Sequence, residues 1–426
     1  MGNEKRKVYL LTNGFPWGKG EKTFIIPEIF YLKKKYDLTI IANVSDRTLV
    51  QKEYFTKLDD SINVIRYASN QLPLKKKIKG IINSLLHKEM WLEIIKILKR
   101  KKNIFVRVRE SIGFYVVAYE FARWLKTSDI IKKEEKAIYY SYWSNSYLLS
   151  VAIKRKDFPN LKTVARLHGV DLYDERYCGE RQPFKWMMDQ ATDCFLFASE
   201  QAMDYYLHKY AINRKSRGKY KLCKLGIQGV NFNSRHRESN CFCILSCSFM
   251  IPLKRIGLII DALAGIKDIQ IKWTHFGDGE EMKTLTERAN KEFGDNIVCC
   301  FKGYADNKTI IKYYKEEIVD CFITTSSTEG GSPVSIMEAM SAYVPIIGTN
   351  VGGISDMIKG NGILLTENPN VAEIQDAIRK IYYSGSSEVE VMRRNSYALW
   401  EKEFSAENNV SKVIRIFDEL LIQKES

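Results

Sequence analysis

The sequence predicts an α/β protein built from two doubly wound, Rossmann-like domains. Runs of apolar and β-branched residues alternate along the chain with glycine-bearing turns and segments of helical periodicity. The order strand, turn, helix occurs in the first half and is repeated in the second, which is typical of parallel sheets covered by helices. At 426 residues, the chain is long enough for two or three domains with complete cores.

The first half opens with a strand-like VYLLT run and a glycine-rich loop. The loop, NGFPWGKGE, lies where we expect the carboxyl end of the first strand, which is where such sheets bind ligands. A helix is expected from Pro27 to Lys35, with the proline at its first position and Ile29 and Leu32 facing the core. The strands of this half are expected at residues 8–12 (the VYLLT run), 38–44, 62–67, 137–143, 163–168 and 194–199, and a last one is expected within 219–232.

The segment from Leu74 to Arg109 is strongly basic. Twelve lysines and arginines stand against Glu89 and Glu93, and apolar residues recur at helical spacing. A basic amphipathic segment with a tryptophan suits an anionic membrane surface. Solvated surface helices packed on the domain are the alternative, and the two interpretations are compatible.

The second half repeats the alternation. Strands are expected at 241–250, 269–276, 297–301, 320–325 and 344–349. Helices are expected at 254–263, 372–403 and 406–423. One further helix should begin after the GDG turn, and another should end at about residue 318. GDGEEM lacks the third glycine of a dinucleotide fingerprint, which weighs against a dehydrogenase. We therefore expect domains at 1–226 and 227–404, and a closing helix at 405–426 that returns to the first domain.

The stretch SSTEGGSPVSIMEAMSAYVPIIGTNVGGI at 326–354 predicts an anion site. Ser332 suits an N-cap and Pro333 the first position of a helix that runs to about Tyr343. Because this helix would open just after a strand, the free N–H groups of Val334 and Ser335 would point at a ligand. The glycines on both sides allow a ligand to approach the backbone closely.

Composition narrows the class of protein. The nine cysteines include no C-x-x-C pair, and several lie in apolar runs, so we expect reduced thiols in a cytosolic protein. No apolar run is long enough to cross a bilayer. Residues 1–110 hold 24 lysines and arginines against 11 acidic residues, which suggests nucleic acid or an anionic membrane as a partner of the first domain.

Several motifs in sequence order resemble the family 4 glycosyltransferases of the GT-B fold. They are YLLTNGFPWGKGEKTFI, HGVD, FMIPLKRIGLIIDAL, and the EGGSP…EAM segment with its following GG turn. The resemblance implies two Rossmann-like domains facing a central cleft and a retaining transfer from a nucleotide-sugar. The chain departs from the family twice: Glu329 and Glu338 are separated by one residue more than usual, and Phe249 replaces an arginine.

The resemblance implies a donor site in the second domain. Lys254 and Arg255 would neutralise the diphosphate with the helix N-terminus, Glu338 would hold the ribose hydroxyls, and Glu329 would contact the sugar. Tyr304 would meet the nucleobase. The remaining donor-side residues are Gly18, Gly277, Gly330, Gly331, Ser332, Pro333, Val334 and Ser335.

On the first domain, His168 would contact the sugar or its α-phosphate, and Asp171 would steady its loop. The acceptor side would also include Gly14, Gly20 and Glu21. The chain contains no D-x-D motif, so we expect no metal site and no cofactor, with Lys254 and a helix dipole in place of a cation. Catalysis is therefore expected to depend on His168, Lys254 and Glu329.

The expected function is synthesis of a surface polysaccharide on a lipid-linked or oligosaccharide acceptor from a UDP- or GDP-sugar. The enzyme would work in the cytoplasm, at the inner face of the plasma membrane, without binding nucleic acid. A sugar-nucleotide epimerase of the same fold, a basic nucleic-acid-binding protein and a catalytically inactive scaffold are the alternatives.

Overall fold

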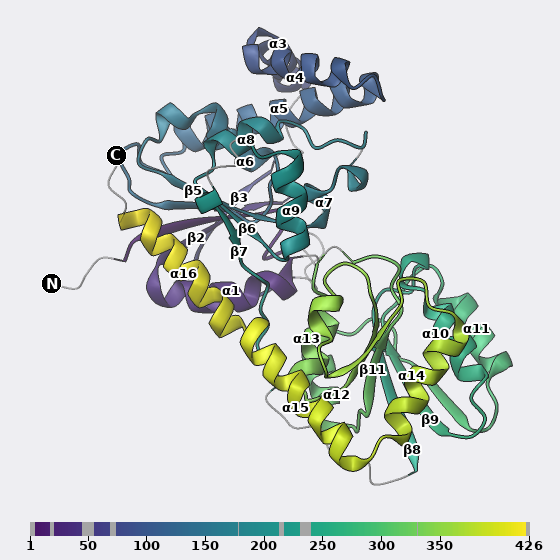
Figure 1. The fold of residues 1–426 in the computed structure, drawn as a ribbon. Coiled ribbons are helices and arrows are strands. Elements are labelled where there is room, and N and C mark those ends of the chain that lie inside the picture. The colour runs from purple at the N-terminus through teal and green to yellow at the C-terminus, as the bar shows by residue number, and fades with distance from the viewer. Residues whose placement is uncertain are drawn as a thin grey trace. The chain divides into compact units, whose positions relative to one another are not determined.

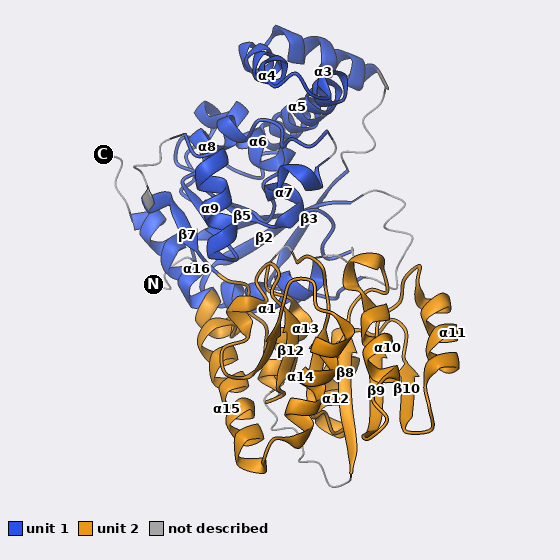
Figure 2. Cartoon of the chain, turned by 45° about the vertical axis from the view of Figure 1, so that its right-hand side comes forward, with its two compact units in different colours: residues 1–223, 410–426 blue, residues 224–409 orange. Residues whose placement is uncertain are grey.

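The computed structural model describes residues 5–17, 21–44, 55–68, 74–177, 179–212, 217–230, 240–329 and 331–422. These residues form two compact units (Figure 2). Unit 1 comprises residues 1–223 and 410–426, and unit 2 comprises 224–409. The chain thus passes from one unit to the other close to the boundary expected at residue 226.

Unit 1 contains a parallel sheet in the order β3-β2-β1-β4-β5-β6-β7. Figure 1 shows this sheet with the helices packed around it. Its strands are β1 (Lys7–Thr12), β2 (Asp37–Asn43), β3 (Asn63–Tyr67), β4 (Ile138–Ser141), β5 (Lys162–Leu167), β6 (Cys194–Phe197) and β7 (Tyr220–Leu222). Every strand predicted in this half is confirmed, with ends shifted by a few residues. Such shifts are ordinary because apolar runs continue into the loops.

Helices cover both faces of this sheet. They include α1 (Lys22–Lys35), α3 (Leu74–Leu86), α4 (Lys88–Lys99), α5 (Ile104–Thr127), α6 (Ser146–Ile153), α7 (Gly169–Leu172), α8 (Lys185–Ala191), α9 (Glu200–Lys209) and part of α16 (Ala406–Ile422). The prediction that the first helix begins at Pro27 is wrong, since α1 starts at Lys22 and holds Pro27 in its interior. The first turn forms earlier because Phe24 N and Ile25 N both donate to Glu21 O.

The closing helix α16 packs on the core of unit 1. Phe417 and Val413 are buried in one cluster with Val8 and Leu10 of β1. Tyr36 Oη donates to Asp418 Oδ1 at 2.9 Å, which anchors the same helix to the end of α1. Residues of α16 from Val410 onward therefore belong to the first unit.

Unit 2 contains a parallel sheet in the order β10-β9-β8-β11-β12-β13. Its strands are β8 (Cys241–Cys247), β9 (Gln270–Phe276), β10 (Ile297–Phe301), β11 (Cys321–Thr324), β12 (Ile346–Thr349) and β13 (Gly362–Leu365). Its helices are α10 (Ile256–Ala264), α11 (Met282–Glu292), α12 (Asn307–Glu316), α13 (Val334–Ser341), α14 (Val371–Tyr383) and α15 (Ser386–Glu403). Both sheets thus have the strand order of a Rossmann fold, and the predicted class is confirmed.

Helix α13 begins one residue later than the sequence suggests. Pro333 has φ −62° and ψ 132°, so its extended backbone makes it the N-cap, and Val334 is the first helical residue. The helix ends at Ser341, before the expected Tyr343, because Tyr343 takes a left-handed conformation with φ 62°. The segment nevertheless opens directly after β11, as predicted.

Candidate active site

The order of strands reverses once in each sheet. The reversal lies between β1 and β4 in unit 1 and between β8 and β11 in unit 2. Ligands of doubly wound sheets bind outside the carboxyl ends of the strands at this point. The predicted site residues lie in the loops that follow these strands and their neighbours, so each unit is described in turn.

In unit 1, Glu21 fixes the loop that follows β1. Its carboxylate accepts hydrogen bonds from Asn13 N at 2.8 Å and from Phe15 N at 3.0 Å, on either side of Gly14. The indole of Trp143, which follows β4, also donates to Glu21. Burial raises the pKa of Glu21. Glu21 therefore joins two loops, and its carboxylate oxygens are engaged within the protein.

His168 directly follows β5 and lies in an aromatic pocket. Its ring centroid is 4.4 Å from that of Trp143, 5.3 Å from Tyr142 and 6.1 Å from Phe24. Burial and the nearby charge of Arg166 lower the pKa of His168 to about 3, so the imidazole is neutral at physiological pH. Its Nε2 is buried and has no hydrogen-bond partner among the described residues. Buried polar atoms usually have a partner, so His168 Nε2 is a candidate for contact with a ligand.

Asp171 connects the loops after β4 and β5. Its carboxylate accepts from His168 N at 2.6 Å and from Ser144 N at 2.5 Å. Lys185 Nζ donates to the carbonyl oxygens of Asp171 and Ser144, the latter at 3.0 Å. Burial raises the pKa of Asp171 to about 6 and lowers that of Lys185 to about 8. Asp171 thus holds the backbone that carries His168.

In unit 2, Lys254 and Glu329 form an ion pair. Lys254 ends the short turn after β8, and Glu329 follows β11. Both side chains are partly buried, with 20% and 14% of their surfaces exposed. Gly352 fits against this turn, because a Cβ there would lie 2.4 Å from the carbonyl oxygen of Glu329. The lengthened glutamate spacing therefore leaves Glu329 within reach of Lys254.

Arg255 is committed to contacts inside unit 2. Its guanidinium donates to the carbonyl oxygens of Thr325 at 2.6 Å, Ser326 at 2.9 Å and Glu367 at 2.8 Å, and to Asn368 Oδ1 at 3.0 Å. These bonds tie the end of β11 to the loop after β13. The structure gives Arg255 the contacts of a positioning residue rather than those of a free cation.

Glu338 lies on α13 with only 4% of its surface exposed. Asn307 Nδ2, at the start of α12, donates to its carboxylate. Burial raises the pKa of Glu338 to about 8, with the Asn307 bond acting in the opposite sense. Its charge and that of Lys254 both act on the nearby thiol of Cys247, whose pKa is raised to about 12 mainly by burial. Lys254, Cys247 and Glu338 thus belong to one cluster.

The N-terminus of α13 completes this cluster. Its first amides, those of Val334 and Ser335, lie ahead of the intrahelical hydrogen-bond ladder. Gly353 N donates to Gly331 O at 3.3 Å, so Gly353 and Gly331 lie side by side, and Ser332 is buried. The free amides of this first turn could therefore bind an anion, as the sequence predicts.

Gly277 and Tyr304 lie at the ends of β9 and β10. Gly277 has φ +142°, and a Cβ there would lie 1.8 Å from Ser248 O. Its N–H donates to Gly303 O at 2.8 Å, next to Tyr304, whose surface is 56% exposed. Phe249, which occupies the place of the family arginine, is 60% exposed. The predicted Gly18, Gly20 and Gly330 lie outside the described residues.

Sequence reasoning missed Trp143, Ser144, Lys185 and Asn307. Trp143 and Ser144 carry the signal that His168 carries, since they lie at the carboxyl end of a predicted strand, but no motif singles them out. Asn307 follows Asp306, which caps α12 by accepting from Thr309 N at 2.8 Å. Lys185 gives no local signal, because its role depends on the tertiary contact with the loop after β4.

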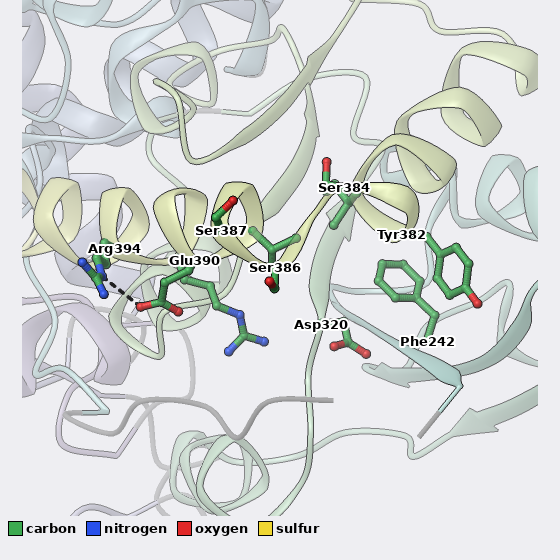
Figure 3. Close-up of a pocket in the computed structure, with 11 residues that line it drawn as sticks. Phe242, Asp320, Tyr382, Ser384, Ser386, Ser387, Glu390 and Arg394 are labelled. Atoms are coloured by element: carbon green, nitrogen blue, oxygen red, sulfur yellow. Dashed lines mark hydrogen bonds and ion pairs between the residues drawn. The ribbon is translucent and has the colours of Figure 1, made fainter. Parts of the chain in front are cut away.

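One cavity of unit 2 lies apart from these residues (Figure 3). It measures about 720 Å³ and is lined by Phe242, Asp320 and Tyr382 together with the first turn of α15. Phe242 and Asp320 lie at the amino ends of β8 and β11, whereas Lys254 and Glu329 follow their carboxyl ends. This cavity is therefore not part of the candidate site.

Residues 231–398 match the family described as glycosyl transferases group 1. Unit 2 carries a group 1 glycosyltransferase domain. The region includes Lys254, Glu329, Glu338 and the whole of α13, which are the residues the motifs had indicated. The expectation of a glycosyltransferase is thereby confirmed.

Two curated relatives match parts of the chain. The uncharacterized glycosyltransferase MJ1178 of Methanocaldococcus jannaschii is 25% identical over 193 residues, 45% of this chain and 52% of that protein. The O-antigen biosynthesis glycosyltransferase WbnH of Escherichia coli is 33% identical over 89 residues, 21% of this chain and 23% of that protein. The chain thus spans about half or less of these relatives.

The fold is similar over nearly the whole chain to that of HepE from Anabaena, solved with UDP and glucose. The TM-score is 0.66 at 13% identity, and the match covers 97% of this chain and 100% of HepE. This similarity assigns the GT-B fold, the class predicted from the sequence. It does not by itself assign a substrate.

Proposed function

We propose that the protein is a retaining glycosyltransferase that moves a sugar from a UDP- or GDP-sugar to a lipid-linked saccharide in surface polysaccharide synthesis. One observation carries the proposal. Lys254, Glu329, Glu338 and the N-terminus of α13 come together at the switch point of unit 2, within the group 1 glycosyltransferase domain. This combination supplies a cation, two carboxylates and free amides where a nucleotide-sugar would lie.

The diphosphate leaving group requires positive charge in the transition state. Lys254 and the first amides of α13 supply it in this proposal. Arg255 fixes the loops on which Lys254 stands, through its bonds to Thr325 O and Ser326 O. Lys254 pairs with Glu329 when no donor is bound, and on binding the donor phosphates replace this carboxylate, which turns to the sugar hydroxyls.

Glu338 is assigned to the ribose. An ionised carboxylate can accept hydrogen bonds from both ribose hydroxyls. The buried carboxyl group is mostly protonated at neutral pH because its pKa is about 8. Donor binding would therefore release a proton from Glu338, with Asn307 holding the carboxylate in place. Tyr304 is exposed at the end of β10, where it can stack on the base.

His168 is assigned to the sugar or its α-phosphate, because its buried Nε2 lacks a partner among the described residues. The N–H of the neutral imidazole donates to the backbone of Tyr142, so Nε2 can accept one hydrogen bond, for example from a sugar hydroxyl, without adding charge. Asp171 and Glu21 keep the two neighbouring loops in position. The proposal requires no metal ion or cofactor, since Lys254 and the helix N-terminus supply the positive charge.

The choice of donor and acceptor class is supported by the relatives. HepE was solved with UDP, and WbnH is named for O-antigen biosynthesis. A UDP-sugar donor and a growing surface saccharide acceptor are therefore the first substrates to test.

An anionic membrane surface is proposed as the place of action. No described helix is long and apolar enough to cross a membrane. Helices α3 and α4 and the start of α5 expose apolar side chains beside many lysines. These are Ile78, Ile81, Ile82, Leu85, Leu86, Trp91, Leu92, Ile95, Leu98, Ile104 and Phe105. An exposed apolar patch flanked by positive charge is suited to the interface of an anionic bilayer. The inner face of the plasma membrane provides such a surface.

A calorimetric screen of UDP-, GDP- and ADP-sugars tests the function. We expect one nucleotide class to bind the wild type and to bind Glu338→Ala much more weakly. Transfer to a saccharide acceptor should continue in EDTA. Binding of none of these sugars, equal binding by the variant, or complete loss of transfer in EDTA would contradict the proposal.

A further inference from the structure

A second cavity, in unit 1, is lined by positive charge. It measures about 380 Å³ and is bounded by Lys96, Lys99, Arg100, Arg181, Lys185 and Lys209, with Trp186 and Tyr210 among the remaining residues. No carboxylate lines it within the described part of the chain. Helix α4 contributes Lys96 and Lys99, its C-cap is Arg100, and α8, α9 and the loop before α8 contribute the others.

The carboxylates nearby do not balance these cations. Arg181 pairs with Glu93, while Arg100 and Lys209 share Asp174 at 3.4 and 2.9 Å. Two carboxylates, those of Glu93 and Asp174, thus form ion pairs with three basic side chains. The protein therefore has an uncompensated positive charge at this cavity.

The remaining three cations form no ion pair within the described ranges, although the charge of Asp171 acts on Lys185. Lys185 Nζ donates to Ser144 O and Oγ, at 3.0 and 2.7 Å. Lys96 Nζ lies 5.6 Å from the ring centroid of Trp186. Lys99 forms no ion pair with any residue in the described ranges, and both Lys96 and Lys99 are exposed. These two lysines are available to a ligand.

The crowding of cations extends behind the cavity. Burial, followed by the charges of Arg100 and Arg181, lowers the pKa of Arg107. Arg107 donates to Gly179 O at 2.7 Å and to Glu180 O at 3.3 Å, but its Nη1 is buried without a partner among the described residues. Burying several unpaired cations close together destabilises the folded protein unless an anion binds between them.

We propose that this cavity binds a phosphate or diphosphate group. Several lysines and arginines that converge on one cavity match the charge and the acceptor oxygens of such a group. The cavity is large enough for a diphosphate with part of its substituent. The residues that line the cavity all belong to unit 1, and the inference does not depend on the glycosyl transfer proposed above.

A lipid headgroup is the favoured source of the phosphate. Lys96 and Lys99 lie one helical turn beyond Leu92 and Ile95, whose surfaces are 44% and 47% exposed. Trp91, also on α4, is 53% exposed. If these apolar side chains enter the bilayer interface, the adjacent lysines lie at headgroup level. The cavity would then bind the phosphate of one lipid while α4 contacts the adjacent lipids.

The experiment uses full-length protein carrying Lys254→Ala, so that the donor cluster does not contribute. Calorimetry measures inorganic pyrophosphate binding, and flotation measures binding to phosphatidylcholine vesicles that contain phosphatidic acid. Lys96→Gln with Lys99→Gln is compared with Lys77→Gln with Lys79→Gln, which removes the same charge from exposed positions of α3 outside the cavity. All four lysines are exposed, so the variants are expected to fold.

We expect pyrophosphate affinity to fall about tenfold or more in the Lys96/Lys99 variant and to stay unchanged in the Lys77/Lys79 variant. A larger loss of vesicle binding in the first variant than in the second identifies a lipid headgroup. Equal losses on vesicles, together with the selective loss of pyrophosphate, identify a soluble phosphate compound instead. No pyrophosphate binding by the parent protein, or equal affinity in both variants, overturns the proposal.

Discussion

Lys254 and Glu329 form an ion pair although 75 residues separate them in the chain. Two features of the fold bring them together: β8 and β11 are neighbours at the switch point, and each residue follows one of these strands. In the proposed function, this pair exists before the donor binds, and the donor phosphates then take the place of Glu329 beside Lys254.

Replacing Lys254 by alanine should reduce turnover by about 10²–10³-fold, because it removes a charge that stabilises the leaving diphosphate. The change also leaves the partly buried Glu329 without its partner. Steady-state kinetics with the donor found by calorimetry measures the effect. Lys283→Ala is the matched control, since this lysine lies in the same unit and its side chain is 88% exposed. Equal turnover in the two variants would exclude Lys254 from catalysis.

His168→Ala and Glu329→Ala should reduce turnover more than nucleotide binding. Both residues are assigned to the sugar, so the free nucleotide does not use them. Calorimetry with UDP or GDP, beside kinetics with the complete donor, separates the two effects. If either variant loses nucleotide affinity as strongly as turnover, its assignment to the sugar is wrong.

Donor affinity should rise with pH up to about 8. Glu338 is protonated below this pH and must lose its proton to accept hydrogen bonds from the ribose. Binding should accordingly release a proton near pH 7, which calorimetry detects by repeating the titration in buffers of different ionisation enthalpy. Glu338→Gln should bind the donor more weakly and without this proton release. A wild type that binds without releasing a proton would contradict the ribose assignment.

Glu338 should also affect the pH dependence of stability. Its pKa is about 8 in the folded protein and near the ordinary glutamate value when unfolded, so the unfolded state binds fewer protons between these values. The free energy of unfolding should therefore decrease as pH rises from about 4.5 to 8. Urea unfolding of wild type and Glu338→Gln at several pH values tests this. As pH rises, the free energy of unfolding of Glu338→Gln should increase relative to that of the wild type, by a few kcal/mol at most.

Much of the fold was predictable because each strand is a short apolar run followed by a turn. Local patterns were insufficient where a distant contact decides the boundary. Helix α1 begins before Pro27 because Glu21 is anchored by the loop after β1, and this anchoring is invisible in a local window. Strand β13 was not expected, since Gly362–Leu365 is a short run that becomes a strand only by pairing with β12.

The candidate site was predictable where motifs mark it. The resemblance of the motifs to the glycosyltransferase family indicated Lys254, Glu329 and Glu338, and the structure pairs Lys254 with Glu329. The positioning residues were not found. Asn307 and Lys185 matter only through contacts made after the chain has folded, to Glu338 and to Ser144 respectively. The sequence had suggested Arg255 as a cation for the donor, yet its donors are directed at backbone oxygens of its own unit.

Membrane binding is the last prediction, and it concerns α3, α4 and the start of α5. Each basic residue close to an anionic surface contributes about 1 kcal/mol, so the charge of this region can hold the protein there. Flotation with phosphatidylglycerol vesicles should show binding that weakens as salt is added, because ions screen the attraction.

Lys75→Glu with Lys77→Glu and Lys79→Glu should reduce this binding. Leu86→Ser with Trp91→Ser should reduce it at high salt as well, since the apolar contribution is not screened. Lys308→Glu with Lys312→Glu, in unit 2, serves as the control. Equal binding to neutral and anionic vesicles, or no loss in the α3 variant, would show that this surface does not bind membranes through its charge.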